Sequence, residues 1–492
     1  EYLFFSIPVT YSRSFRLSRK SRKSSPPGML EHSPGCREWT TVVLGCIVTF
    51  FFSYFFYGWA AMQALFEMDG VYEEVCPMED SLCSQRGSRM VLLFSVDNTV
   101  SILSGTVFGL LVDRTGPVVL CVLGGVLQSL ALLMMGLVEG DPSSVWDPLL
   151  LAFVLSGIGG TALMVQSLKL AFIVAPKHFT LVMALANCLV DSSSVVPLGL
   201  YRLHVAGLSR GEVFSGYAIL CFVLSMCLAY SWCGPPNARL CAANRKERNA
   251  AESNEESKRQ GVVSTSHPRL HGLSLKEQLY SMEFAFAVVF MMTQVFRSNS
   301  YLGIIKEILQ DLGDAEIDNF YTQILTILLP ASTLLIPAFD VCMKKGGFAV
   351  TFLVVSLLGL TWNVVMLIPS LWVQVIGFAA FSNFRGLLFA SFFTFIGHSF
   401  GNRTFGRINA ILWFLTFLLS LLVWPITELS KTWTGDMTFM SIFLLILFVP
   451  AFILLLVLAF HLRKHPAGDI AQTVPKTPTD PKVETQNTEP HI

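Results

Sequence analysis

The sequence predicts an all-α, multi-pass membrane protein whose twelve spanning helices form two six-helix halves. Three observations lead to this prediction. Of the 492 residues, 53% are hydrophobic and only 14% are charged, whereas soluble domains carry about 25% charged residues. The apolar residues gather into runs of the length that a helix needs to cross a bilayer, about 20 residues. Basic and acidic connections alternate along the chain.

The apolar runs are separated by short connections, except that a longer polar segment follows the sixth run. Because no water in the bilayer core can satisfy backbone polar groups, each run is expected to be a helix. The expected helices span residues 39–66, 89–112, 117–138, 148–175, 179–203, 212–233, 281–308, 318–342, 346–368, 371–399, 405–428 and 437–462.

These runs divide the chain into five parts. The polar ends and most of the linker between the halves are expected to be disordered, because they hold few apolar residues. Leu273, Leu275 and Leu279 at the end of the linker predict a short amphipathic helix on the membrane surface. The five parts are an N-terminal arm 1–38, a first bundle 39–233, a linker 234–280, a second bundle 281–462 and a tail 463–492.

The basic residues predict which side of the membrane each connection faces. Lys and Arg are enriched in cytoplasmic connections, and here they fill the arm, the linker and the connection that holds Arg403 and Arg407. Acidic residues fill the connections after the first and seventh runs. We therefore expect both termini in the cytoplasm and a plasma-membrane location. Residues 1–28 do not begin with Met, and Met29 offers an alternative start, so this segment is interpreted as disordered or as an artefact of gene prediction.

A short, charged connection between the second and third runs places an acid and a base at one membrane face. Gly109, Asp113, Arg114 and Gly116 form its core. Two helices joined so tightly must run antiparallel. A partial echo lies between the eighth and ninth runs, where Asp340 precedes two lysines. We expect the Asp113 segment to act on conformation, so that Asp113→Ala changes turnover more than substrate choice.

Polar side chains inside the first four runs are candidates for a substrate cavity. Tyr57 either anchors the first helix at the membrane interface or faces the cavity. Asp97 lies within the second run, where an ionisable group is costly and faces protein or water. It either makes a structural hydrogen bond or binds the substrate or a proton. In the fourth run, Gln166 is expected to face inward and Lys169 to extend to the surface.

The fifth run contains the most polar cluster of any span, near mid-depth. On a helix, Asn187, Asp191 and Ser194 share one face, and we expect Asp191 and its neighbours Ser192 and Ser194 to bind substrate. Serine hydroxyls can instead bond back to the helix backbone, which is the structural alternative for Ser192. Pro197 is expected to kink the helix.

Gln294 and Tyr301 in the seventh run, with Asn383 and Arg385 in the tenth, complete the predicted binding groups. An Arg in the bilayer centre must be paired or hydrated. Arg385 is therefore expected to pair with the acid of the second or the fifth run, or to hydrogen-bond a carboxylate or carbonyl of the substrate. A pocket needs only a few such polar groups, and aromatic residues would stack on a planar substrate.

Two cysteines, Cys76 and Cys83, share a connection that is expected to lie outside the cell. Oxidation is favoured there, and we expect a disulfide rather than two free thiols. Most of the other cysteines lie in the runs as small apolar residues. No spacing indicates a metal site and no ATP-binding motif is present. We expect no cofactor, no nucleic-acid partner, and a monomer that contacts the lipid bilayer and a small-molecule substrate.

The Asp113 segment resembles the loop signature of the major facilitator superfamily, in which small residues, then Asp-Arg and Gly, join the second and third helices. The final basic cluster of that signature is missing, because Pro117-Val118-Val119 follows. The resemblance implies the twelve-helix major facilitator fold, with parallel halves that each contain inverted repeats and work by alternating access.

Several segments also resemble one family, solute carrier family 43, which includes the sodium-independent large neutral amino acid carriers and the equilibrative nucleobase carrier. The serine run is similar to the nucleobase branch, since the amino acid branch keeps a shorter Ser-Ser. Related carriers in unicellular parasites move amino acids, including cationic ones. The similar segments are Tyr57-Gly58-Trp59, Gly159-Gly160, Asp191-Ser192-Ser193-Ser194, Arg385-Gly386 and Phe405-Gly406.

Together these features predict a transporter that moves a small polar organic solute, an amino acid or a nucleobase, by alternating access as a facilitative uniporter. A proton-coupled symporter of the same fold is the alternative, with Asp97 or Asp191 as the proton carrier. A membrane-embedded transferase is disfavoured because His178, His204 and His398 are scattered. A non-transporting receptor is disfavoured because the tail is short and is expected to be disordered.

Overall fold

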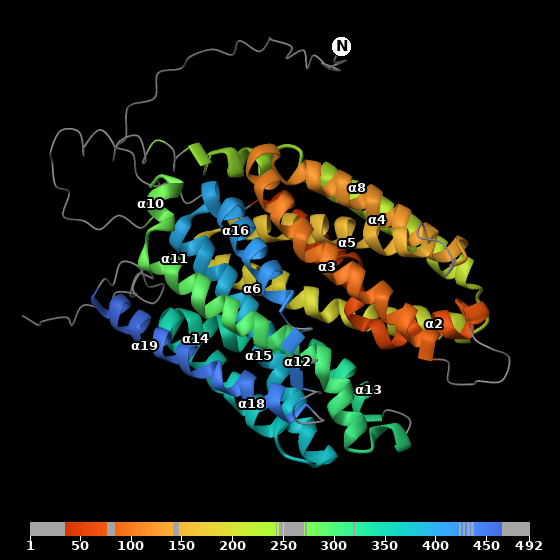
Figure 1. Ribbon diagram of the computed structural model, residues 1–492. Coiled ribbons are helices and arrows are strands. Elements are labelled where there is room, and N and C mark those ends of the chain that lie inside the picture. Colours follow the sequence, from red (N-terminus) through yellow and green to blue (C-terminus); the bar gives the residue numbers. More distant parts are fainter. Residues whose placement is uncertain are drawn as a thin grey trace, which may run out of the picture. The chain divides into compact units, whose positions relative to one another are not determined.

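The structure, a computed structural model, is helical throughout the part of the chain that it describes, and that part contains no strand. Figure 1 follows the helices by colour from the N-terminal to the C-terminal end of the chain. The described residues are 35–75, 84–140, 147–242, 244–245, 249, 270, 273–317, 320–422, 425–426, 429–430, 433 and 437–464.

Six spans form the first half, and three of them contain more than one helical element. The second, third and sixth spans are single helices, whereas 3₁₀ turns (η) interrupt or end the others. The elements are α1 Cys36–Phe52, η1 Phe55–Gly58, α2 Trp59–Met68, η2 Glu73–Val75, α3 Ser84–Thr115, α4 Pro117–Leu137, α5 Pro148–Ser167, η3 Leu168–Phe172, α6 Pro176–Ser192, η4 Ser193–Val195, α7 Val196–Val205 and α8 Arg210–Trp232.

The second half repeats this pattern of long helices with local breaks. Its seventh span contains one π turn, η5, and its eighth contains a long 3₁₀ stretch, η7. The elements are α10 Leu275–Leu279, α11 Met282–Phe286, η5 Ala287–Met291, α12 Met292–Asp311, η6 Asp314–Ile317, α13 Phe320–Leu328, η7 Leu329–Leu335, α14 Ile336–Met366, α15 Leu371–Phe400, α16 Asn402–Ser420, α18 Thr438–Ile446 and α19 Phe448–Lys464.

Twelve spans can be followed through these elements. Eight segments of the described chain are long and apolar enough to cross a membrane, and one of them, Phe320–Met366, has 47 residues, enough for two crossings. It is divided at Gly347, whose φ of 68° lies in the left-handed region that glycine adopts without strain. The first, seventh and eleventh spans, which are broken or more polar, complete the twelve.

Two of the breaks meet at the same place in the first half. A Cβ atom on Gly58 of η1 would lie 2.1 Å from the carbonyl oxygen of Ser194 in η4, so only glycine permits this contact between the two turns. The turn η4 ends two residues before Pro197, which lacks the N–H group that a continuous helix requires. The expected irregularity of the fifth span is therefore present. It lies beside a break in the first span, which the sequence does not reveal.

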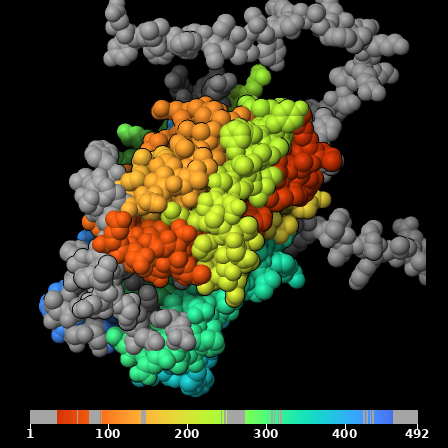
Figure 2. All heavy atoms as spheres, turned by 90° about the vertical axis from the view of Figure 1, so that its right-hand side faces the viewer, coloured from red at the N-terminus to blue at the C-terminus, as the bar shows by residue number. Residues whose placement is uncertain are grey.

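Helices pack against one another within each half, and two seams join the halves. In the first half, α4 lies between α5 and α8, and α8 also contacts α1. Figure 2 shows this order, with the yellow-green α8 beside red and orange segments of the first half. In the second half, α14 packs against α15 and α19. The halves meet along two seams, α3 against α16, and α6 against α14 and α15.

The outer faces of the helices are apolar. Many leucine, valine and phenylalanine side chains are exposed, for example Leu133 of α4, Phe222 of α8 and Ile453 of α19. A soluble protein would bury such side chains, whereas lipid tails solvate them. The exposed apolar surface agrees with the expected multi-pass membrane protein.

The start of the expected linker is helical, which corrects the prediction of disorder there. Residues 235–242 form a helix after Gly234, and Pro235 and Pro236 occupy its first positions, where proline is tolerated. Arg239 ties this helix to α1 through a 2.8 Å ion pair with Glu38. The short helix expected at the end of the linker is also present, as α10.

Candidate functional site

A buried ion pair joins the two halves. Nε of Arg385 on α15 donates to Oδ1 of Asp191 on α6 over 2.9 Å, and their side chains are 4% and 7% exposed. Arg385 Nη1 also donates to Ser298 Oγ on α12 at 3.3 Å. Of the pairings that the sequence allowed for Arg385, the structure forms the one with the acid of the fifth span. Each charge is the partner of the other in a place that is largely shielded from solvent.

Aromatic rings surround this pair. The guanidinium carbon of Arg385 lies 4.8 Å from the ring centroid of Tyr57 and 5.5 Å from that of Phe389. Tyr57 stacks on Tyr54 with centroids 5.3 Å apart and an interplanar angle of 11°. Both tyrosines precede or belong to the turn η1, so the break in the first span orients them. Tyr57 therefore faces the protein interior rather than the membrane interface.

A small cavity lies beside the pair, with a volume of about 30 Å³. Because a buried water needs about 10–15 Å³ measured in the same way, this cavity has room for about two waters and for no amino acid or nucleobase. In this structure the halves therefore leave too little space for a substrate beside the pair. Its lining residues are Tyr54, Tyr57, Met164, Asn187, Val190, Asp191, Arg385, Phe389, Phe393 and Trp413.

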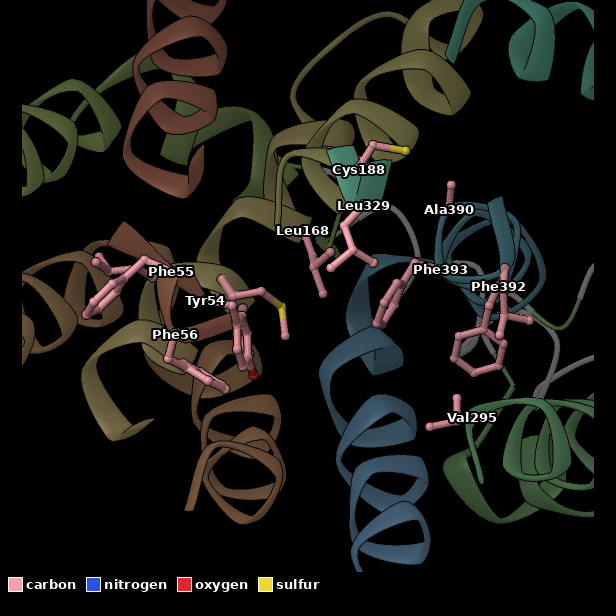
Figure 3. Close-up of a cluster of buried hydrophobic side chains, with 14 of the residues drawn as sticks. Tyr54, Phe55, Phe56, Leu168, Cys188, Val295, Leu329, Ala390, Phe392 and Phe393 are labelled. Atoms are coloured by element: carbon pink, nitrogen blue, oxygen red, sulfur yellow. The ribbon is translucent and has the colours of Figure 1, made fainter. Parts of the chain in front are cut away.

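Both halves contribute aromatic and aliphatic side chains to the surrounding core. Figure 3 shows Tyr54, Phe55 and Phe56 from the first half together with Phe392 and Phe393 of α15 in one buried cluster. Next to it, the hydroxyl of Ser192 on α6 hydrogen-bonds that of Thr333 in η7, across the second seam. Ser192 also donates to the carbonyl oxygen of Cys188. The hydroxyl of Ser194 is buried and makes no hydrogen bond to the described residues.

A second polar contact between the halves lies at the end of α3, which we call the Asp113 end of the bundle. The Asp113 carboxylate is 1% exposed. It accepts hydrogen bonds from the backbone N–H groups of Gly406 at 3.1 Å and Arg407 at 2.9 Å, near the start of α16. A helix N-terminus favours a negative charge, so this contact closes the α3–α16 seam.

Lys169 strengthens the same contact, contrary to the expectation that it extends to the surface. It is buried, and Nζ lies 3.0 Å from Asp113 Oδ1. Nζ also donates to the carbonyl and side-chain oxygens of Asn402, the first residue of α16. The turn η3, which contains Lys169, brings the ammonium group to a buried carboxylate, and ion pairing there outweighs solvation at the surface.

Two glycines make this closure sterically possible. A Cβ atom on Gly109 would lie 2.7 Å from the carbonyl oxygen of Gly406, and a Cβ on Gly406 would lie 2.2 Å from that of Gly109. The connection then turns at Gly116, whose φ of 78° is left-handed. Arg114 is exposed. Gly109 and Asp113 of the motif therefore belong to the contact between the halves, whereas Arg114 lies outside it.

No protein-family model matches the chain. Arginine transporter 1 of Toxoplasma gondii is 22% identical over 470 residues, which is 84% of this chain and 85% of that protein. The large neutral amino acids transporter small subunit 3 of Homo sapiens is 25% identical over 202 residues, which is 38% of this chain and 36% of that protein.

Two solved structures decide the fold. The proton:xylose symporter XylE bound to 6-bromo-6-deoxy-D-glucose superposes with a TM-score of 0.58 at 15% identity, over 85% of this chain and 94% of that one. The major facilitator superfamily transporter FucP in its outward conformation superposes with a TM-score of 0.53 at 11% identity, over 85% and 98%. The chain has the major facilitator fold. The twelve-helix prediction is thereby confirmed.

Seven of the ten residues predicted to bind substrate are outside the cavity lining, and four of these seven, Gln166, Asn383, Gln294 and Tyr301, make contacts elsewhere within their own half. Gln166 accepts a hydrogen bond from the indole of Trp232 and donates to the carbonyl of Leu163, inside the first half. Asn383 bonds back to its own helix at Ala379. Gln294 and Tyr301 belong to a separate cluster, and we leave all four out of the proposed site.

That separate cluster is centred on Arg297 of α12, which was not among the residues predicted to bind substrate. Arg297 is fully buried and donates to the carbonyl oxygens of Leu444 and Gly359, each at 2.9 Å, and to the side-chain oxygens of Gln294 and Asn363. These acceptors tie α12 to α14 and α18, so the cluster stabilises the second half. Tyr301, one turn further along α12, packs its ring 4.8 Å from that of Trp362.

The remaining predictions fall outside these contacts. Asp340 forms a 2.6 Å ion pair with Lys344, four residues later on α14, so this echo of the motif is bonded within one helix rather than to the other half. Cys76 and Cys83 lie outside the described residues. Among the described residues, no group of three or more His, Cys, Asp or Glu side chains is arranged to hold a metal ion.

Proposed function

We propose that the protein carries a neutral α-amino acid across the membrane by alternating access. The observation behind this proposal is the buried pair of Arg385 and Asp191, which joins the halves at the wall of a small cavity. A pair of opposite charges at that position is costly to bury and is replaceable by apolar residues in a purely structural role. A ligand with one negative and one positive group would give the buried pair a role in binding.

An amino acid carries a carboxylate and an ammonium group a few bonds apart, the complement of this pair. The guanidinium group of Arg385 suits a carboxylate, which it can bind with two parallel hydrogen bonds. The carboxylate of Asp191 suits an ammonium group. A zwitterion inserted between them would replace one ion pair by two, so neither buried charge would be left unpaired.

The rest of the cavity favours a large neutral side chain. Arg385 and Asp191 are the only charged residues in its described lining, and most of the other positions are apolar or aromatic. Phe389, Phe393 and Trp413 can contact an apolar side chain, whereas a cationic side chain would meet no second acid. Two of the relatives are named as transporters of arginine and of large neutral amino acids, and the lining supports the second of these classes.

Alternating access follows from the position of the contacts. Asp113 and Lys169 hold the halves together at one end of the bundle through α16. Breaking these contacts would open the cavity at that end. The basic connections of the sequence support assigning the Asp113 end to the cytoplasm. We further propose a monomer in the plasma membrane, since a single chain supplies both halves of the site.

A nucleobase is the second candidate, and one observation favours it. Tyr54 and Tyr57 present stacked rings beside the cavity, and a planar base stacks well on such rings. A neutral nucleobase, however, supplies no charged group to either member of the Arg385–Asp191 pair. We therefore favour a zwitterionic amino acid over a nucleobase as the substrate.

Counterflow in proteoliposomes tests the proposal. Purified protein would be reconstituted with one unlabelled substrate inside, and uptake of labelled amino acids and nucleobases would be compared with protein-free liposomes. We expect exchange of large neutral amino acids. Exchange of nucleobases alone, or of none of these compounds, would overturn the proposal.

A further inference from the structure

We propose that Asp97 of α3 is the site at which this carrier binds a coupling proton, which would make transport proton-linked. The inference rests on the proposed function and extends it. It also selects between Asp191 and Asp97, because Asp191 forms an ion pair with Arg385, whereas Asp97 forms none with the described residues.

Asp97 is fully buried, with 0% of its surface exposed. Its Oδ1 accepts a 3.3 Å hydrogen bond from Ser101, one turn along the same helix. Its Oδ2 has no hydrogen-bond partner among the described residues, and no ion pair there joins Asp97 to a cation. The other buried acids at the interface between the halves, Asp113 and Asp191, each bind a basic side chain.

A carboxylate in this position is far more costly than a neutral acid. Burying an unpaired charge in a low-dielectric interior costs so much that such a group neutralises instead. A proton on Oδ2 removes the charge. It also supplies a donor for the hydroxyl oxygen of Ser156 on α5, a neighbour of Asp97 whose Oγ likewise lacks a partner among the described residues. The geometry of the closed state thus fits protonated Asp97.

Among the described residues around Asp97, no basic side chain forms an ion pair with its carboxylate. From α5, Ser156 and Gly157 face Asp97, and a Cβ on Gly157 would lie 3.1 Å from its Oδ1. From α16, the ring of Trp413 packs on Gly105, two turns further along α3. The titratable groups that interact with Asp97 are the phenols of the first span. Those phenols belong to Tyr54 and Tyr57.

A chain of polar groups, three hydroxyls and the backbone carbonyl oxygen of Ser101, leads from Asp97 to the cavity. Ser101 bonds Asp97, Thr161 of α5 donates to the carbonyl oxygen of Ser101 at 3.2 Å, and the Tyr54 hydroxyl lies 3.1 Å from Thr161 Oγ1. Tyr54 lines the cavity beside Asp191 and Arg385. When the cavity opens to one side and admits water, this polar path would hydrate Asp97 and let its proton exchange with that side.

The transport cycle then balances in charge. A proton from the outer solution binds Asp97, a zwitterion binds Arg385 and Asp191, and the closed state carries both. Opening at the Asp113 end releases the zwitterion and the proton to the other solution. One positive charge crosses with each neutral amino acid, so both a pH gradient and a membrane potential would drive uptake.

The test compares exchange with gradient-driven accumulation in the same proteoliposomes. For the intact chain, a one-unit pH gradient, acidic outside, should concentrate labelled leucine inside by up to about tenfold at one proton per substrate. Asp97→Asn, which mimics the protonated acid and lies outside the cavity lining, should retain leucine counterflow but lose this accumulation. Asp311→Asn, an exposed acid at the end of α12, is the matched control and should accumulate leucine as the intact chain does.

A second readout needs no variant. Leucine added outside liposomes that contain a pH-sensitive dye should acidify their interior. Leucine exchange without acidification or accumulation in the intact chain would overturn proton coupling and leave the proposed transport standing. Retained accumulation in Asp97→Asn would overturn the assignment to Asp97. Absence of any exchange in the intact chain would overturn the proposed function and this inference with it.

Discussion

The 2.9 Å hydrogen bond from Arg385 Nε to Asp191 Oδ1 joins α15 of the second half to α6 of the first half. It is the contact at which the halves, the cavity and the proposed substrate meet. If the pair serves only the fold, replacing both members together should leave transport intact. If the pair binds substrate, the same double replacement should abolish transport. The first experiment uses that difference.

Removing one member of the pair should destabilise the protein, whereas replacing both should not. Asp191→Asn or Arg385→Gln leaves a buried charge unpaired, and we expect a loss of about 3–5 kcal/mol in unfolding free energy. The double replacement of Asp191 by Leu and Arg385 by Met removes both charges and should recover most of that loss. Thermal unfolding of the purified protein in detergent measures this.

Transport should not follow stability in that series. The double variant should be folded and yet show no leucine counterflow, because neither charged group of the substrate has a partner. Counterflow near the level of the intact chain in the double variant would show that the pair serves the fold alone.

Asp113→Asn should change the rate of transport and leave its selectivity intact. The substitution removes the charge that accepts hydrogen bonds from the start of α16 and from Lys169. Hydrogen bonds to charged groups contribute about 1.5–3 kcal/mol each, so we expect kcat to change by tenfold or more. Arg114→Gln, at the exposed neighbour, is the control and should change kcat less than twofold. A changed order of preference among amino acids in Asp113→Asn would contradict the conformational role.

A methyl group at Gly406 should prevent closure at the Asp113 end. The added Cβ would lie 2.2 Å from the carbonyl oxygen of Gly109 and 2.6 Å from Asp113 Oδ1, distances at which the backbone of a helix must shift. We expect Gly406→Ala to lower uptake at least tenfold. Gly216→Ala on α8, where no atom lies within 4 Å of the added Cβ, should transport normally. Normal uptake in both variants would show that the seam does not close as described.

Arg297→Met should weaken the fold without changing what is bound. Its neutral acceptors lie on α14 and α18 and on its own helix, away from the cavity. We expect a large fall in the unfolding temperature and an unchanged competition profile among amino acids for the protein that remains folded. A selective loss of one substrate class would return the Arg297 cluster, with Gln294 and Tyr301, to the binding site.

How far the sequence predicts this molecule depends on the kind of interaction. The spans and the pairing of Arg385 follow from the high free-energy cost of polar groups in lipid, which acts on each run separately. The turn η1 does not follow, because the contact of Gly58 with Ser194 that accompanies it arises only once two helices pack. The prediction that Lys169 extends to the surface is wrong for the same reason, since its partner Asp113 lies 56 residues away in the chain.

The substrate-binding residues remain a prediction. Tyr57, Asp191 and Arg385 line the cavity, whereas Gln294 is bonded to Arg297. The polarity of the runs did not indicate which face of each helix meets the cavity, because that depends on how the helices pack.

The most direct test of the central claim is competition by analogues that lack one charge of the substrate. In leucine counterflow through the intact chain, leucinamide lacks the carboxylate for Arg385 and 4-methylpentanoate lacks the ammonium group for Asp191. Leaving one buried charge unpaired costs about 2–5 kcal/mol, so each analogue should compete at least about thirtyfold more weakly than leucine. Competition by either analogue as strong as that of leucine would contradict the assignment of the Arg385–Asp191 pair to the two charged groups of an amino acid.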